Sequence, residues 1–263
     1  MKQDASAQPE RGKLFERAWR WRELRLPYLL LAPSVLVLLA LSIYPLIYAV
    51  KVSLQTGTGA GLRWSVQNFA RLAGDRFFFE ALKHTLVYAA VALTCEFLLG
   101  LALAVLLNNC LRGRTFFRAV LLVPMMLPPV VVGVVWRLML NPHFGAINGT
   151  LNGAGLDTSA LLWTASPRLA LLSVIMVDVW QWTPFIMLIA LAGLSAVPKY
   201  LYEAADVDRA SGWFKFRHIT LPLVTPLLLI AILFRVIDSY KMFDQAYGLT
   251  GGGPAGATQV LSI

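Results

Sequence analysis

EAADVDRASGWFKFRHITLP, residues 203–222, lies between two apolar runs that are each long enough to cross a bilayer. Charged and aromatic residues are interleaved along it, which is typical of a short amphipathic segment held at a membrane surface. The small side chains of Ala204 and Ala205 would let another surface approach the backbone closely. We therefore expect the rest of the chain to position this stretch as a docking element.

Local signals in the same stretch predict two short helices joined by a turn. Ser195 can cap a helix that opens near Pro198, where the missing amide hydrogen would be unpaired anyway. Ser211 can cap a second helix, which carries Trp213 and Phe216. The alternative is a segment that has no protein partner and lies among lipid headgroups, with its aromatic rings buried in lipid.

The composition indicates an all-α polytopic membrane protein. Of 263 residues, 58% are hydrophobic and only 14% are charged. The net charge of +9 does not indicate nucleic-acid binding, because the basic residues are divided among short segments that flank apolar runs. Two cysteines, Cys95 and Cys110, imply neither a disulfide framework nor a metal site.

Five apolar runs are long enough to cross the hydrocarbon core, about 30 Å thick. They are residues 27–50, 85–107, 119–140, 169–196 and 221–240. The basic tail 1–26 and the short basic turn 108–118 predict a cytoplasmic N-terminus and place the loop 197–222 in the cytoplasm. A signal peptide is disfavoured, because the first run is too long and no small-residue cleavage site follows it.

Several expected spans contain polar residues or prolines. Glu96 would face other helices, as a residue of the transport path or as a partner in a helix–helix hydrogen bond. Asp178, Gln181 and Phe185 recur at helical spacing, with Trp180 beside them, and predict either a hydrated solute path or an aromatic packing layer with one paired acid. Two further features are an Arg235–Asp238 ion pair and a kink in the third span at its prolines, Pro124, Pro128 and Pro129.

Residues 203–222 resemble the EAA loop of inner-membrane permease subunits in binding-protein-dependent ABC importers. That pattern is Glu-Ala-Ala, three residues, Gly, nine residues, Ile, one residue, Leu-Pro, and the matching positions are Glu203, Ala204, Ala205, Ile219, Leu221 and Pro222. The resemblance implies a coupling helix that enters a cleft on a cytoplasmic ATPase, with its bend near Asp208 and Arg209. Arg209 replaces the motif glycine and would cost about 1 kcal/mol or more if the bend needs a positive φ.

The resemblance covers nearly the whole chain. It is strongest to the carbohydrate-importer group, and there to the subunit type of the larger maltose permease and the glycerol-3-phosphate A-type permease. The residues that carry it are Leu26-Pro27-Tyr28, Ala32-Pro33, Tyr44-Pro45, Trp182-Thr183-Pro184-Phe185, Ala192-Gly193-Leu194, Phe243-Asp244, Leu249-Thr250-Gly251-Gly252-Gly253-Pro254 and Ala257-Thr258. A type I importer bundle is implied over residues 27–263. Members of the group continue through a sixth core span, so we expect a chain truncated before it.

The resemblance also implies function and partners. The chain would be a non-enzymatic permease in a bacterial-type inner membrane, importing a sugar, polyol or glycerol phosphate by alternating access. It would pair with a second permease, a dimer of ATPase subunits that bind ATP and Mg, and an extracytoplasmic solute-binding protein. One rival is a truncated, non-transporting protein that only docks the ATPase or packs in the bilayer. A membrane enzyme is the other, disfavoured because His84, His143 and His218 fall in different loops.

Overall fold

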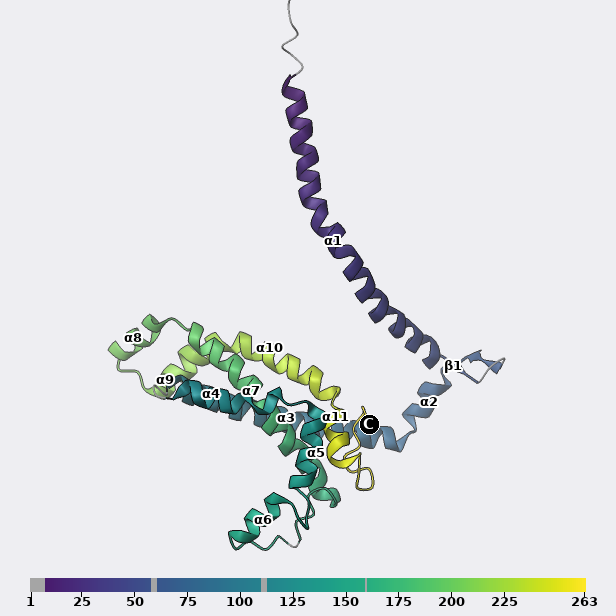
Figure 1. The fold of residues 1–263 in the computed structure, drawn as a ribbon, viewed down its shortest axis with the longest axis vertical. Helices are drawn as coiled ribbons and strands as arrows, with labels where there is room; N and C mark the ends of the chain where they lie inside the picture. Colours follow the sequence, from purple (N-terminus) through teal and green to yellow (C-terminus); the bar gives the residue numbers. More distant parts are fainter. Residues whose placement is uncertain (1–7, 58–60, 110–112, 159) are drawn as a thin grey trace, which may run out of the picture. The chain divides into compact units, whose positions relative to one another are not determined.

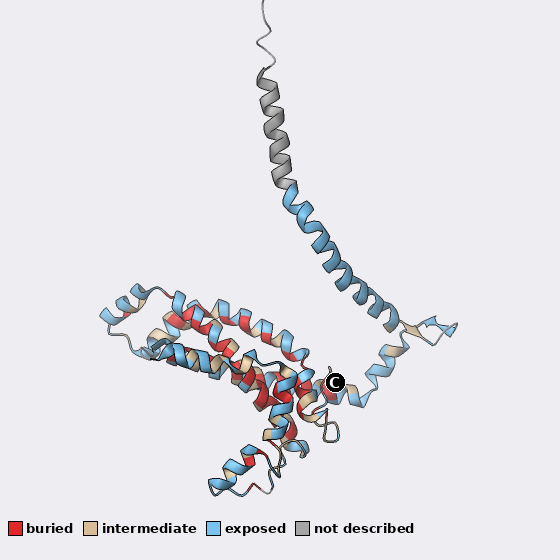
Figure 2. Cartoon of the chain, viewed as in Figure 1, coloured by how far each residue is buried: buried red, intermediate tan, exposed pale blue. Residues whose placement is uncertain are grey.

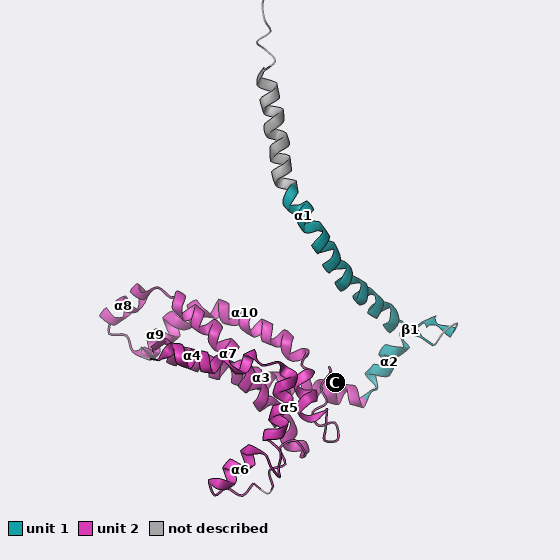
Figure 3. Ribbon diagram, in the orientation of Figure 1, with its two compact units in different colours: residues 1–75 teal, residues 76–263 magenta. Residues whose placement is uncertain are grey.

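The computed structural model describes residues 8–57, 61–109, 113–158 and 160–263, with side chains from residue 26 onward. The expectations for Cys110, and for the side chains of the basic tail, lie outside the described residues. The chain forms two compact units, residues 1–75 and residues 76–263 (Figure 3).

The first unit is dominated by one long helix, α1 (Gln8–Ser53), which contains the expected first span (Figure 1). The backbone of the tail is continuous with that span, because the helix starts well before residue 27 and tolerates three internal prolines. After α1 come β1 (Gln55–Thr56) and β2 (Arg63–Trp64), an antiparallel pair in which Gln55 lies opposite Trp64, and then α2 (Gln67–Ala73). Asn68 ties α2 to this turn by donating to the Ser53 and Gln55 carbonyls at 3.1 and 2.9 Å.

Three long helices form the body of the second unit: α3 (Arg76–Asn109), α7 (Pro167–Ala196) and α10 (Leu221–Tyr240). Their buried residues lie along the facing sides, and the outer sides are exposed and apolar (Figure 2). Glycines let the helices approach closely: a Cβ on Gly100 of α3 would lie 2.8 Å from Ile186 Cβ of α7. The outward apolar surface is what a bilayer requires.

The kink expected at the prolines of the third span, residues 119–140, is present as a complete break in the helix. This segment is divided into α4 (Arg114–Leu122), a 3₁₀ turn η2 (Pro124–Met126) and α5 (Pro129–Met139). Prolines lack the amide hydrogen that continues a helix, and the residue before a proline avoids the helical region, so the Pro128–Pro129 pair ends one helix and starts another. Within the described residues, four helical segments are long and apolar enough to cross a membrane: Leu26–Ser53, Arg76–Asn109, Pro167–Ala196 and Gly212–Tyr240.

Shorter helices complete the second unit. They are α6 (Ala146–Gly153), α8 (Lys199–Val207), α9 (Gly212–Lys215), the π-helical turn η3 (Phe216–Thr220) and α11 (Asp244–Thr250). α11 packs backbone to backbone on α5, since a Cβ on Gly133 would lie 2.6 Å from the Gln245 carbonyl oxygen. In the segment expected to be external, Trp163 Nε1 donates to Asn148 Oδ1 at 2.7 Å and so fixes α6 to the following loop.

Two apolar clusters form the core of this unit. One surrounds Tyr88, Val132, Val177 and Leu249, and the other surrounds Ala104, Met187, Ala190 and Val224. On α3, Glu96 lies in sequence between the two clusters, and Asp178 does so on α7. The most polar residues of the bundle are therefore enclosed between apolar layers.

Candidate functional site

The loop between α7 and α10 folds as a helix, a tight bend and a second helix. α8 ends in a Schellman arrangement, in which Arg209 N–H donates to the Asp206 carbonyl at 3.0 Å and Ala210 N–H donates to the Ala205 carbonyl at 2.9 Å. Arg209 occupies the position that most often holds glycine, and its φ of 55° is left-handed. The bend therefore needs a positive φ at residue 209, which is the condition under which Arg209 was expected to cost conformational free energy relative to glycine.

The two predicted helices are present, with one correction at the first cap. Ser211 Oγ accepts from Phe214 N–H at 3.2 Å and caps α9 as expected. Ser195 does not cap α8: it is still inside α7, and its hydroxyl donates to the Leu191 carbonyl at 2.8 Å, a common alternative for a helical serine. Pro198 takes the N-cap position instead.

Side-chain contacts hold the two arms of the loop together. Lys215 of α9 forms an ion pair with Asp206 of α8. Tyr202 and Thr220 share a hydrogen bond of 2.8 Å between their hydroxyls, which fixes α8 to the π-helical turn. α9, η3 and α10 run as one helical segment, Gly212–Tyr240. The second arm of the loop is therefore continuous with a helix that is long and apolar enough to cross a membrane.

The loop carries a hollow of about 510 Å³. Its lining is mostly small or apolar: Leu201, Ala204, Ala205, Asp208, Ala210, Ser211, Phe214 and Ile219. Glu203 is exposed on the same helix, whereas Ala205 is 8% exposed and packs inward. Leu221 is half-buried at the start of α10, where Pro222 is exposed. The arrangement combines an open apolar depression with exposed charges, which suits a protein partner.

A second polar assembly lies inside the bundle, around Arg235 of α10. Its guanidinium donates to both oxygens of Glu96 on α3, at 2.8 Å from Nε and 2.7 Å from Nη2, and to Asp178 Oδ2 on α7 at 2.8 Å. Nη1 donates to Asp238 Oδ2 at 2.5 Å, which confirms the predicted pair. Glu96, Asp178 and Arg235 are at most 2% exposed, whereas the Asp238 side chain is 54% exposed.

Other groups complete this cluster. With its amide oriented so that donors meet acceptors, Gln245 of α11 donates to Asp178 Oδ1 at 3.0 Å and accepts from the Asp178 backbone N–H at 3.1 Å. The Arg235 guanidinium carbon lies 4.9 Å from the centre of the Trp182 ring, a cation–π distance. Arg235 thus joins α3, α7 and α10 through one cation, and Gln245 adds α11 to the same cluster. Among the described residues, no group of three His, Cys, Asp or Glu side chains is placed to hold a metal ion.

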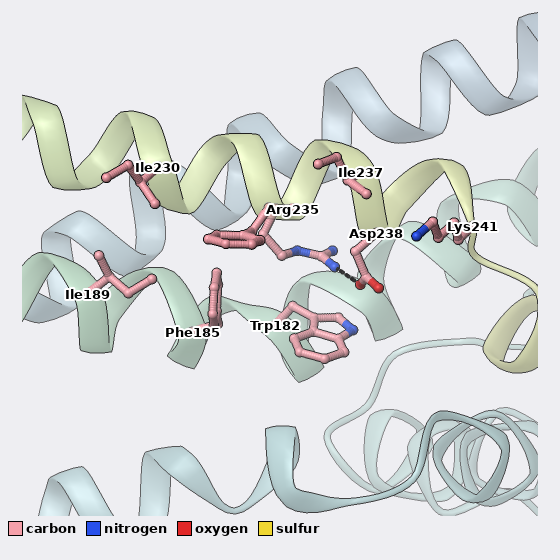
Figure 4. Close-up of a pocket in the computed structure, with 9 residues that line it drawn as sticks. Trp182, Phe185, Ile189, Ile230, Arg235, Ile237, Asp238 and Lys241 are labelled. Atoms are coloured by element: carbon pink, nitrogen blue, oxygen red, sulfur yellow. Dashed lines mark hydrogen bonds and ion pairs between the residues drawn. The ribbon is translucent and has the colours of Figure 1, made fainter. Parts of the chain in front are cut away.

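An open groove of about 470 Å³ lies between α7 and α10 (Figure 4). Trp182, Phe185 and Ile189 line it from α7, and Ile230, Phe234 and Ile237 line it from α10. Arg235, Asp238 and Lys241 gather toward one end, where the dashed line marks the ion pair (Figure 4). The volume is within the usual range of ligand sites, and the mixture of aromatic rings with a few polar groups is typical of them.

The predicted path residues are divided by the structure. Phe185 lines the groove, whereas Asp178 and Gln181 lie outside its lining. Asp178 is compensated by Arg235, and Gln181 is buried and donates from Nε2 to the Leu127 carbonyl at 3.0 Å. Glu96 is also enclosed, so its role as a helix–helix partner is the one observed.

Trp180 is 40% exposed and makes an edge-to-face contact with Trp136, at 5.3 Å between ring centres. It too lies outside the lining of the groove.

Sequence reasoning missed part of the groove. Asp238 is predicted from sequence only as the partner of Arg235, and Lys241 is not predicted, although the three residues are spaced by three and follow one face at the end of α10. Trp182 appears in the sequence only as part of the family-like run Trp182-Thr183-Pro184-Phe185. The spacing of these residues can be read from the sequence, but the sequence does not indicate which face of α10 packs against α7.

Comparison with known proteins places the chain among transport proteins. A curated relative, the trehalose/maltose transport system permease protein MalF of Thermococcus litoralis, is 38% identical over 251 residues, covering 93% of this chain and 83% of the relative. The trehalose transport system permease protein SugA of Mycobacterium tuberculosis is 36% identical over 237 residues, covering 89% and 75%. The lactose transport system permease protein LacF of Rhizobium radiobacter is 30% identical over 240 residues, covering 90% and 80%.

Solved structures support the fold. A chain in the crystal structure of a bacterial alginate ABC transporter, in complex with an alginate pentasaccharide-bound periplasmic protein, superposes with a TM-score of 0.77 at 22% identity, covering 92% of this chain and 82% of that one. The family model described as binding-protein-dependent transport system inner membrane component matches residues 96–263, more than half of the chain. The loop, the buried charge cluster and the groove all lie within these residues, and the chain belongs to this family of inner-membrane transport components.

Proposed function

We propose that this chain is a permease subunit of an ATP-driven sugar importer, in which loop 197–222 passes the motion of an ATPase to the membrane helices. The proposal rests chiefly on the geometry of the loop: a hollow and an exposed Glu203 on α8, bound by side chains to a helical segment that continues through the membrane. Sugars are the class of solute named for the curated relatives, which supports the same class here.

Membership of the family supports a set of partners for this chain. A second permease, a dimer of ATPase subunits with ATP and Mg, and an extracytoplasmic binding protein would complete the importer. The N-terminus and the loop would lie in the cytoplasm. Movement of the loop would tilt α10 relative to α7, and because the groove lies between these helices, its access would change with that movement.

The groove is the proposed solute contact. Trp182 and Phe185 offer rings against which the C–H faces of a sugar can pack, and Asp238 and Lys241 offer partners for its hydroxyl groups. This replaces Asp178 and Gln181, which are buried in the bundle and bonded there to Arg235 and to the Leu127 carbonyl. Glu96, Asp178 and Arg235 instead fix the helices that form the groove walls.

The experiment is sugar uptake by the complete importer, with trehalose and maltose as probes. Glu203→Ala should lower the maximal rate of uptake and the amount of co-purifying ATPase, because it removes a charge from the docking face. Trp182→Ala should raise KM while ATPase co-purification stays normal. Glu80→Ala, an exposed carboxylate paired with Arg76 at the start of α3, is the control and should change neither quantity. Unaltered uptake and co-purification in Glu203→Ala would contradict the proposed coupling role.

A further inference from the structure

The bend of the loop contains a residue whose backbone conformation is unfavourable for its type. Arg209 has a φ of 55°, in the left-handed region that glycine adopts without a Cβ penalty. The Schellman hydrogen bonds of Arg209 and Ala210 fix this conformation, so it belongs to the end of α8. Strained backbone of this kind clusters at functional sites, which makes the Arg209 side chain a candidate for a functional purpose.

The contacts of Arg209 within the chain do not supply that purpose. Lys215 of the same loop is paired with Asp206, whereas Arg209 is exposed and forms no ion pair with any residue in the described part of the chain. The Arg209 guanidinium is therefore available to form an ion pair with a second molecule, and that pair would offset the strain of the backbone.

The position of Arg209 indicates which molecule. Its neighbours on both sides, Asp208 and Ala210, line the 510 Å³ hollow of the loop. The hollow is largely apolar, with alanine side chains that leave room for an entering side chain. Arg209 is thus flanked on both sides in the chain by residues that line the hollow, within reach of a carboxylate on a partner seated there.

We propose that Arg209 is an electrostatic anchor of the loop. Its guanidinium would pair with a carboxylate of the ATPase subunit, carried by a side chain that enters the hollow when the loop is docked. The inference rests on the proposed coupling function. Arginine suits this role because its planar guanidinium can bind a carboxylate through two parallel hydrogen bonds. The anchor would offset the backbone strain only in the assembled importer.

The test compares the folding of the loop with its binding. The full chain is co-expressed with its partner permease and ATPase, and ATPase retention is measured from low to high salt for wild type, Arg209→Gly, Arg209→Lys and Arg217→Ala. Arg209→Gly should weaken retention about tenfold at low salt and reduce its salt dependence, because one interfacial charge pair is lost. Hydrogen exchange of α8 and α9 in the isolated permease should become slower in the same variant, because the bend is relaxed.

The controls separate this anchor from general basicity. Arg217 is another exposed cation of the loop, but unlike Arg209 it has no chain neighbour that lines the hollow, so Arg217→Ala should retain the ATPase as wild type does. Arg209→Lys should recover part of the retention, since it keeps the charge and loses the planar fork. Equal or tighter retention by Arg209→Gly overturns the inference while the coupling function stands.

Two further outcomes would also overturn it. If Arg209→Gly loses binding to vesicles that contain phosphatidylglycerol but retains the ATPase, the partner is a lipid headgroup. If wild type itself retains no ATPase, the proposed function fails together with the inference.

Discussion

Arg235 shows how a single residue determines the interior of the bundle. Its guanidinium lies among carboxylates from α3, α7 and α10, and it is 2% exposed. Carboxylates without a cation are costly inside a membrane protein, so Glu96 and Asp178 depend on this one residue. The bidentate contact with Glu96 also fixes the rotation of α10 about its axis.

Arg235→Met should lower the free energy of unfolding by about 3–5 kcal/mol, because two enclosed carboxylates lose their partner. Thermal unfolding in detergent measures the effect, with Lys241→Met, an exposed cation at the end of α10, as the control. The triple variant Glu96→Gln, Asp178→Asn, Arg235→Met should recover most of the loss, since no uncompensated charge remains in the core. A triple variant as unstable as the single one would contradict this account.

At the scale of elements, prolines and glycines decide how the third expected span is built. Pro124, Pro128 and Pro129 divide it, and the freed Leu127 carbonyl accepts from Gln181 of α7. The resulting helix α5 is too short to pack as a full span, and it is held by α11 through the close approach at Gly133. The break therefore creates a site where α11 can enter the bundle.

Gly133→Ala should destabilise the bundle by about 1–3 kcal/mol, because its Cβ would lie 2.6 Å from the Gln245 carbonyl oxygen and backbone must move. Gly149→Ala in α6 is the matched control: nothing lies within 4 Å of its Cβ, so the gain in helix propensity should leave the protein equally or slightly more stable. The measurement is the melting temperature of each purified variant. Equal melting temperatures for the two variants would show that α5 and α11 are not packed as described.

At the scale of the whole molecule, basic residues and apolar length set the orientation in the membrane. Residues 108–118 contain three arginines and no acid, whereas residues 141–168 contain few basic residues. Because short basic segments stay in the cytoplasm, we expect α6 to lie outside and loop 197–222 to lie inside.

Cysteine labelling tests this orientation. In a background with Cys95→Ser and Cys110→Ser, Gly149→Cys should react with a membrane-impermeant maleimide on intact cells, and Gly212→Cys should react only after permeabilisation. Both glycines have open space around their Cβ positions, so neither substitution should disturb the fold. Labelling of Gly212→Cys on intact cells would reverse the proposed topology.

The sequence by itself determined the class, four of the spans and the loop. Apolar run length decides membrane spanning locally, and residues that cap, bend and pack a short helix act through their immediate neighbours, so Ser211 and the Arg209 bend were predictable. The Arg235–Asp238 pair was predictable for the same reason, since both residues lie one helical turn apart.

Only the tertiary structure decided which polar residues meet. Glu96 and Arg235 are separated by 139 residues, and no helical periodicity indicates which faces of α3, α7 and α10 turn toward one another. Once those faces were set, Asp178 and Gln181 became interior partners, and Trp182, Phe185 and Asp238 became the lining of the groove. Partner choice between helices depends on close packing at glycines and on compensation of buried charge, and both act between segments that are distant in sequence.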